Sequence, residues 1–149
     1  MKTRFNFVDT AKDIVVGMGK TYYVGENENN PVKVDVYYND DFIHEPIIID
    51  TFRLASEEEI IAMKLEVISR QGRKKDFWDI HKLISDYTIN EMLALHEKRY
   101  PYSHDATAIK NNFRQFSKAD QDFDPKCLRG KYWDVIKSDM KKFAKGIQL

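Results

Sequence analysis

Residues 56–84, SEEEIIAMKLEVISRQGRKKDFWDIHKLI, decide the fold of the second half of this chain and place two charged side chains among apolar ones. Each helical residue turns by about 100°. Lys64 then falls near the middle of a broad apolar arc, and Asp76 falls within the arc of the next helix. Because burying an unpaired charge costs several kcal/mol, the sequence predicts that both have partners. The two arcs consist of Ile60, Ile61, Met63, Leu65, Val67 and Ile68, and of Phe77, Ile80, Leu83, Ile84 and Tyr87.

Two interpretations of these charges follow. Lys64 and Asp76 can form a structural ion pair between antiparallel helices, or Asp76 can simply favour a helix N-terminus through the helix dipole. Alternatively, both side chains line a polar cleft that binds or activates a ligand. The residues alone leave both interpretations open.

The same segment carries a family resemblance. The run IIAMKLEVISRQGRKKDFWDIHKLI resembles the signature of the abortive-infection nucleotidyltransferase family, the AbiEii toxins, whose fold is that of DNA polymerase beta. DYTINEMLALHEKRYP and FRQFSKADQDFDPKCL resemble its later helical segments, so the resemblance covers about residues 32–144. It implies transfer of a nucleotide from a nucleoside triphosphate to an RNA, a tRNA end, by the toxin of a toxin–antitoxin pair in phage defence.

The resemblance also implies roles for three residues. Lys64 matches the motif lysine, which would steady the triphosphate, and Asp76 matches the later motif aspartate, which would assist the attacking group. Asp35, within VKVDVYY, resembles a carboxylate on a strand beside the metal site. The expected ion is magnesium or manganese.

The N-terminal part departs from the family pattern. Family members carry a glycine and serine loop, and then a strand with two acidic residues one position apart that hold the ions. Here only Glu26 and Glu28 have that spacing, in the polar turn GENENNP with no such loop before it. We therefore expect an N-terminally truncated enzyme that is impaired alone, its missing carboxylates supplied by a second chain or by upstream sequence. The alternative is a noncatalytic protein-binding module or a degenerate relic of the family.

Basic residues form two clusters. The first, just before Asp76, is expected to bind substrate together with Lys64, whereas charge runs otherwise mark solvated faces. The first cluster is Arg70, Arg73, Lys74 and Lys75, and the second is Lys137, Lys141, Lys142 and Lys145.

Other motifs are weak. GMGKT at 17–21 lacks the first glycine of a phosphate-binding loop, because Ile14 stands there. Asp122 and Asp124 lie in a loop without the glycine and final glutamate of an EF-hand. The four histidines lack metal-ligand spacing, and Cys127 alone cannot form a disulfide or a zinc site.

Composition sets the remaining limits. The 149 residues, 42% of them hydrophobic, suit one domain and contain no apolar run near the roughly 18 residues that span a membrane. The single cysteine and the N-terminus, which does not resemble a signal peptide, indicate a reducing, cytoplasmic setting. Twenty-four basic and twenty-four acidic residues cancel, so any contact with nucleic acid must be local.

The predicted architecture is α+β, a small mixed or antiparallel sheet followed by a helical C-terminal half. We expect one domain over 1–149, with a partial nucleotidyltransferase sheet region in 1–55 and a helical region in 56–149. An unpaired sheet edge predicts a homodimer. Residues 4–16 are ambiguous, because RFNFV alternates like a strand whereas DTAKDIVV can form a short helix, and a helix ending before Gly17 is favoured. Strands are expected at 21–24, 32–38 and 47–52, and helices at 56–72, 75–86, 89–99, 106–117 and 132–144, the first with a capping box of Ser56 and Glu59.

Overall fold

The computed structural model describes residues 4–10 and 19–147 and divides the chain into two compact units, Met1–Asp41 and Phe42–Leu149. Antiparallel strands make up the first unit, and a hairpin with five helices makes up the second. The α+β class is therefore confirmed. Residues 42–55, which we had grouped with the sheet region, belong to the helical unit.

The first unit holds a three-stranded antiparallel sheet in the order β1-β2-β3. The strands predicted at 21–24 and 32–38 are confirmed as β2 (Gly19–Gly25) and β3 (Val32–Tyr37), which pair as a hairpin. The helix predicted within 4–16 is wrong at residues 7–10. These residues form the strand β1 (Phe7–Thr10), which pairs with β2. The alternating pattern RFNFV is that of a strand, and a neighbouring strand supplies its hydrogen bonds. Residues 11–16 lie outside the described residues.

A short hairpin begins the second unit. β4 (Ile47–Ile49) pairs with β5 (Phe52–Leu54), so the single strand predicted at 47–52 is wrong. The chain reverses at Asp50, whose φ of 54° is left-handed. Apolar side chains remain about half exposed along this hairpin, namely Ile47, Ile48, Ile49, Phe52 and Leu54.

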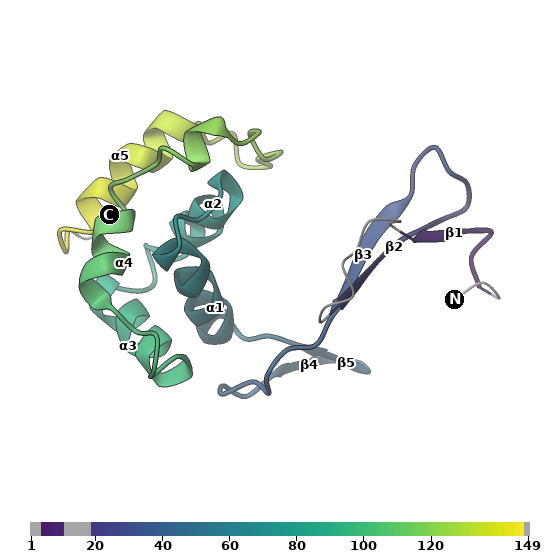
Figure 1. Ribbon diagram of the computed structural model, residues 1–149, viewed down its shortest axis with the longest axis horizontal. Helices are drawn as coiled ribbons and strands as arrows, with labels where there is room; N and C mark the ends of the chain where they lie inside the picture. Colours follow the sequence, from purple (N-terminus) through teal and green to yellow (C-terminus); the bar gives the residue numbers. More distant parts are fainter. Residues whose placement is uncertain (1–3, 11–18, 148–149) are drawn as a thin grey trace. The chain divides into compact units, whose positions relative to one another are not determined.

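All five helices predicted between residues 56 and 144 are present. Figure 1 shows α3, α4 and α5 following one another around α1 and α2. α4 ends before the predicted Ser117, because tighter bonds between residues three apart replace the α-helical ones at Arg114 and Gln115. The helices are α1 (Glu57–Ser69), α2 (Lys74–Leu83), α3 (Ile89–Arg99), α4 (Ala106–Asn112) and α5 (Trp133–Phe143), with a 3-10 turn at Ala119–Gln121.

The core of the helical unit centres on Phe77 of α2. Its ring lies 5.1 Å from that of Phe116, 5.9 Å from Trp133 and 6.3 Å from Phe113, measured between centroids. Phe113 and Phe116 therefore lie in the core, and the partly buried Trp133 packs against it. Aromatic pairs at such separations stabilise a fold beyond the area they bury.

The apolar arc of α1 is narrower than predicted. Ile61, Leu65 and Ile68 are fully buried, whereas Ile60 and Val67 are more than a third exposed. Lys64 is four residues after Ile60 and three before Val67, so it lies on the face that these exposed residues share. In this position the ammonium group of Lys64 can reach water while its aliphatic chain packs against α1 and α2.

Glu59 has a different role from the one predicted. The hydroxyl of Ser56 accepts the Glu59 N–H at 3.3 Å, so the N-cap of α1 is confirmed. The Glu59 carboxylate, fully buried, instead accepts the backbone N–H groups of Ile43 and His44, both at 3.2 Å, and pairs with Arg99 of α3. It therefore ties the start of the second unit to two helices.

Candidate functional site

Lys64 and Asp76 meet. The ammonium nitrogen of Lys64 lies 2.9 Å from Oδ1 of Asp76, which is only 1% exposed. The predicted pairing of the two charges is therefore confirmed. The contact joins α1 to α2 at the point where the chain turns between them.

Asp76 also stabilises the start of its own helix. It lies in the first turn of α2, and its Oδ2 accepts the backbone N–H of Arg73 at 3.0 Å. Both structural alternatives, the ion pair and the helix N-terminus, thus hold at once. Gly72 makes the approach possible, since a Cβ there would lie 3.2 Å from Cα of Ile68.

A third residue completes the cluster. Oδ2 of Asp79 lies 2.6 Å from the Lys64 nitrogen, and the Asp79 side chain is 49% exposed. Asp79 is not among the site residues predicted from the sequence. Its position three residues after Asp76 puts both carboxylates on one side of α2, and this spacing could have revealed it. We call Lys64, Asp76 and Asp79 the lysine–carboxylate cluster.

The interactions within the cluster favour the charged forms of Lys64 and Asp76. Burial alone would lower the pKa of Lys64, but the hydrogen bonds and charges of Asp79 and Asp76 outweigh it, so the pKa of Lys64 is raised. Burial likewise acts to raise the pKa of Asp76, but Lys64 and the Arg73 N–H hold it below its usual value. Lys64 and Asp76 are therefore both ionised at neutral pH.

The first basic cluster does not act as a unit. Arg70 pairs with Glu66 one turn earlier, and Arg73 lies 3.5 Å from Asp76. Lys74 is mostly buried, 2.7 Å from Asp124, with its ammonium over the ring of Trp133. Lys75 instead lines a pocket.

Asp35 lies in the other unit, on β3. It accepts a hydrogen bond from the Thr21 hydroxyl at 2.6 Å and pairs with Lys33 at 3.0 Å. Among residues 4–10 and 19–147, no three His, Cys, Asp or Glu side chains form a group that could hold a metal ion. Magnesium usually takes one or two carboxylates together with substrate phosphates, and Asp35 is the carboxylate that the sequence singles out for this role.

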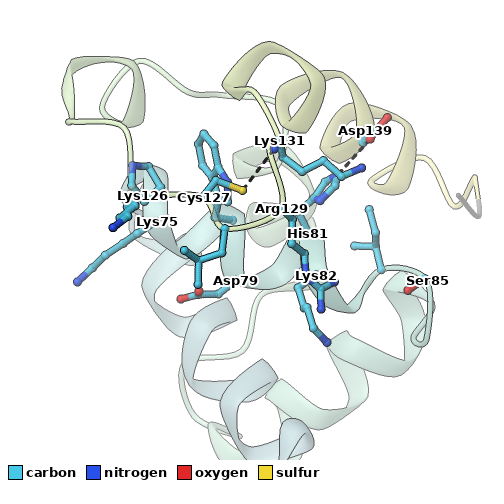
Figure 2. A pocket seen from close by; sticks show the side chains of 14 residues that line it. Lys75, Asp79, His81, Lys82, Ser85, Lys126, Cys127, Arg129, Lys131 and Asp139 are labelled. Carbon is cyan, nitrogen blue, oxygen red and sulfur yellow. Dashed lines mark hydrogen bonds and ion pairs between the residues drawn. The ribbon is translucent and has the colours of Figure 1, made fainter.

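The pocket, not predicted from the sequence, has a volume of about 570 Å³. It lies between α2, residues 125–131 and α5, and Figure 2 shows the side chains that surround it. The Nε2 atom of His81 lies 3.0 Å from Oδ2 of Asp139 at one wall. His81 and seven charged residues line the pocket, the latter being Lys75, Asp79, Lys82, Lys126, Arg129, Lys131 and Asp139.

The second basic cluster is largely occupied within the fold. Lys137 pairs with Asp120 and Asp134, both at 3.1 Å, and Lys142 lies 3.6 Å from Asp139. The GMGKT motif falls partly outside the described residues, and its last three residues lie in β2 rather than before a helix.

The molecule is thus an α+β protein whose first two helices hold a lysine between two carboxylates. A model of the nucleotidyl transferase AbiEii toxin of type IV toxin–antitoxin systems matches residues 2–147. The chain therefore belongs to the AbiEii nucleotidyl transferase toxin family, a class that acts on nucleotides and implies an antitoxin partner. No curated protein and no solved structure matches the chain. Within the described residues, no helix is long and apolar enough to cross a membrane.

Proposed function

We propose that this chain is a toxin-type nucleotidyltransferase in which Lys64 contacts the phosphates of a nucleoside triphosphate, with an RNA, specifically a tRNA, as acceptor. The lysine–carboxylate cluster carries this proposal. A lysine ammonium has three N–H donors, and Asp76 and Asp79 occupy two of them. The third can donate to a phosphate oxygen while the buried pair stays intact. Membership of the toxin family supports the nucleotide substrate.

The two carboxylates suit different tasks. Both oxygens of Asp76 are engaged, one by Lys64 and one by the Arg73 N–H, so Asp76 positions the lysine. Asp79 is half exposed and is the better candidate to accept a proton from the attacking hydroxyl group. The sequence had suggested this second task for Asp76.

A magnesium or manganese ion would supply positive charge against the triphosphate in this chemistry. Asp35 is the carboxylate that we propose as a metal ligand, and a lysine already pairs with it. One carboxylate is fewer than such a site needs, so we expect residues 1–149 alone to transfer nucleotides slowly. Carboxylates from a second chain would complete the site.

The test incubates the purified chain with each labelled nucleoside triphosphate, magnesium or manganese, and total tRNA. We expect measurable triphosphate binding, weaker in Lys64→Ala and unchanged in Lys98→Ala, with little label on RNA. Absence of triphosphate binding would contradict the proposed role of Lys64. Label on RNA that disappears in both Asp35→Ala and Lys64→Ala would instead make this chain a complete enzyme.

The second candidate function is a noncatalytic protein-binding module or relic of the family. The exposed apolar side chains of the β4–β5 hairpin favour it, because contiguous exposed apolar surface is typical of interaction sites. Triphosphate binding that depends on Lys64 separates the two candidates. The lone Cys127 supports a reducing, cytoplasmic setting, and the toxin family supports a role in phage defence.

A further inference from the structure

The pocket beside α2 has an excess of positive charge. Its lining includes five lysine and arginine residues against two carboxylates. Both carboxylates already have partners, since Asp79 pairs with Lys64 and Asp139 with His81. Within the described part of the chain, no ion pair engages any of the five cations, Lys75, Lys82, Lys126, Arg129 and Lys131.

These cations come from two elements. Lys75 and Lys82 are seven residues apart on α2, which separates them by about 10 Å along the helix. The other three come from residues 125–131, which turn back over α2, as Figure 2 shows. All five side chains are exposed, so they reach solvent at the pocket rather than packing inside the fold. A span of this length exceeds one phosphate group and suits a chain of phosphates.

The pocket also has an aromatic wall. Trp78 lines it, and its indole stacks on that of Trp133, with ring centroids 5.3 Å apart and an angle of 11° between the planes. Cations that follow a backbone, together with an aromatic ring for a base, are the chemistry by which proteins bind single-stranded nucleic acid. The volume of about 570 Å³ is large enough for a nucleotide unit.

We propose that this pocket binds the phosphodiester backbone of the RNA acceptor, as a site additional to the lysine–carboxylate cluster. The inference rests on the proposed function for the identity of the acceptor. Because the chain has zero net charge, its contact with RNA must be a local basic surface, and this pocket provides one. Arg129 and Lys131 are the principal phosphate contacts, because guanidinium and ammonium groups bind phosphate through charge-assisted hydrogen bonds.

Cys127 provides a direct probe of occupancy. It is the chain's one cysteine, it lines the pocket, and its sulfur accepts the Lys131 backbone N–H at 3.4 Å. The indole N–H of Trp78, followed by the backbone N–H groups of Arg129, Lys131 and Gly130, holds the pKa of Cys127 below its usual value. A thiol of this kind reacts readily with alkylating reagents.

The experiment measures the rate at which iodoacetamide modifies Cys127 in the full chain, followed by mass spectrometry. The additions are inorganic phosphate, a nucleoside triphosphate, or a short single-stranded RNA, each alone and at matched ionic strength. We expect RNA to slow the reaction at least several-fold more than the other two. Since no transfer reaction takes place, failure of nucleotide transfer would leave this result intact.

A titration with labelled RNA supplies the second measurement. Each phosphate contact on single strands contributes about 0.7 to the slope of log affinity against log salt. Arg129→Glu is expected to weaken binding about tenfold or more and to reduce that slope by at least one such contact. Lys98→Glu, an exposed lysine on α3 away from the pocket, is the matched control and is expected to bind RNA like the parent chain.

Three outcomes would overturn the proposal. Protection of Cys127 by the triphosphate but not by RNA would make the pocket a nucleotide site. Equal alkylation rates under all conditions would mean that the five cations are only solvated charges. Equal loss of RNA binding in Arg129→Glu and Lys98→Glu would place the RNA elsewhere.

Discussion

Lys64 is held by one buried and one exposed carboxylate, and this difference determines what each substitution costs. Asp76 is buried and accepts hydrogen bonds from the Lys64 ammonium group and the Arg73 N–H. Asp79 is half exposed and pairs with the Lys64 ammonium group. Loss of Asp76 removes a charge-assisted hydrogen bond and the first-turn contact of α2 together. Loss of Asp79 removes an interaction that water largely replaces.

Asp76→Ala is expected to lower the free energy of unfolding by about 2–3 kcal/mol, from a hydrogen bond worth about 1.5–3 kcal/mol and the helix contact. Removal of one partner of a buried ion pair typically costs roughly 3–5 kcal/mol. The cost expected here is at or below the lower end of that range, because Asp79 keeps its contact with Lys64. Asp79→Ala, the control, is expected to cost less than about 1 kcal/mol. Urea unfolding measures both values.

The double variant Lys64→Met with Asp76→Leu tests the coupling of the pair. It is expected to recover much of the loss, because it removes both charges rather than one. Recovery stays incomplete, since the Arg73 N–H still lacks its carboxylate. Strictly additive losses would show that Lys64 and Asp76 do not interact in solution.

Acid is expected to destabilise the helical unit through His96. This ring is fully buried, with Nδ1 2.9 Å from Nδ1 of His104 and Nε2 3.1 Å from Glu66. Burial lowers the pKa of His96 below 6.5, and the opposing effect of Glu66 is smaller. The unfolded chain therefore binds the proton first, so this contribution to stability is present above pH 6.5 and is lost as the pH falls below it.

Thermal unfolding across this range, with NMR titration of the His96 ring, measures the effect. His104→Asn removes the neighbouring imidazole, whose charge also lowers the pKa of His96. The pKa of His96 should therefore rise in this variant. A His96 ring that titrates above pH 6.5 would contradict this account.

At the scale of elements, the connection between α1 and α2 is the tightest point near the candidate site. A Cβ at Gly72 would lie 3.0 Å from Cγ1 and 3.2 Å from Cα of Ile68, and the second of these is backbone. The preceding Gln71 has a left-handed φ of 61°, a conformation that costs a side chain energy.

Substitutions in this connection should have opposite effects. Gly72→Ala is expected to destabilise by about 1–3 kcal/mol, because α1 and α2 must separate to admit the methyl group. Gln71→Gly is expected to stabilise by up to about 1 kcal/mol, because glycine adopts this φ freely. Chemical denaturation of both variants measures these changes, and a neutral Gly72→Ala would show that the connection has room to adjust.

Local signals made the helices predictable. Side chains of Ser56, Thr88 and Asp105 cap α1, α3 and α4, and each cap can be read from the sequence within one turn. The short strands depend on partners elsewhere in the chain, and β4 and β5 are joined by a turn at Asp50 without the usual glycine. Local patterns therefore could not decide between a strand and a helix at 4–16, and could not reveal the division at 47–54.

The candidate site, like the helices, was predictable only where a local sequence pattern marked it. Lys64 and Asp76 were found because a charge within an apolar arc is anomalous, and their contact is confirmed. Asp79 escaped because an exposed aspartate is ordinary. The cationic pocket depends on residues 125–131 lying against α2, an arrangement of distant segments that no local pattern encodes.

At the scale of the whole molecule, the sheet of the first unit has β1 and β3 at its edges among the described strands. β3 carries exposed Val32, Val36 and Tyr37. Edge strands of this kind tend to pair with another chain. This property supports our proposal of a homodimer.

Sedimentation at high micromolar concentration tests the association. The parent chain is expected to sediment as a dimer, and Val36→Lys, which places a charge on the edge strand, is expected to shift it towards monomer. Lys98→Ala serves as the control on α3. A parent chain that remains monomeric would contradict the proposal.

The isoleucines of β4 bear on how the chain behaves during synthesis. Three consecutive β-branched residues, Ile47, Ile48 and Ile49, are each about half exposed in a two-stranded hairpin. Uncharged segments of high strand propensity promote aggregation when many copies are made at once. Recombinant expression should therefore yield inclusion bodies readily, and a charged gatekeeper at the most exposed of the three, Ile48, should shift the product towards the soluble fraction.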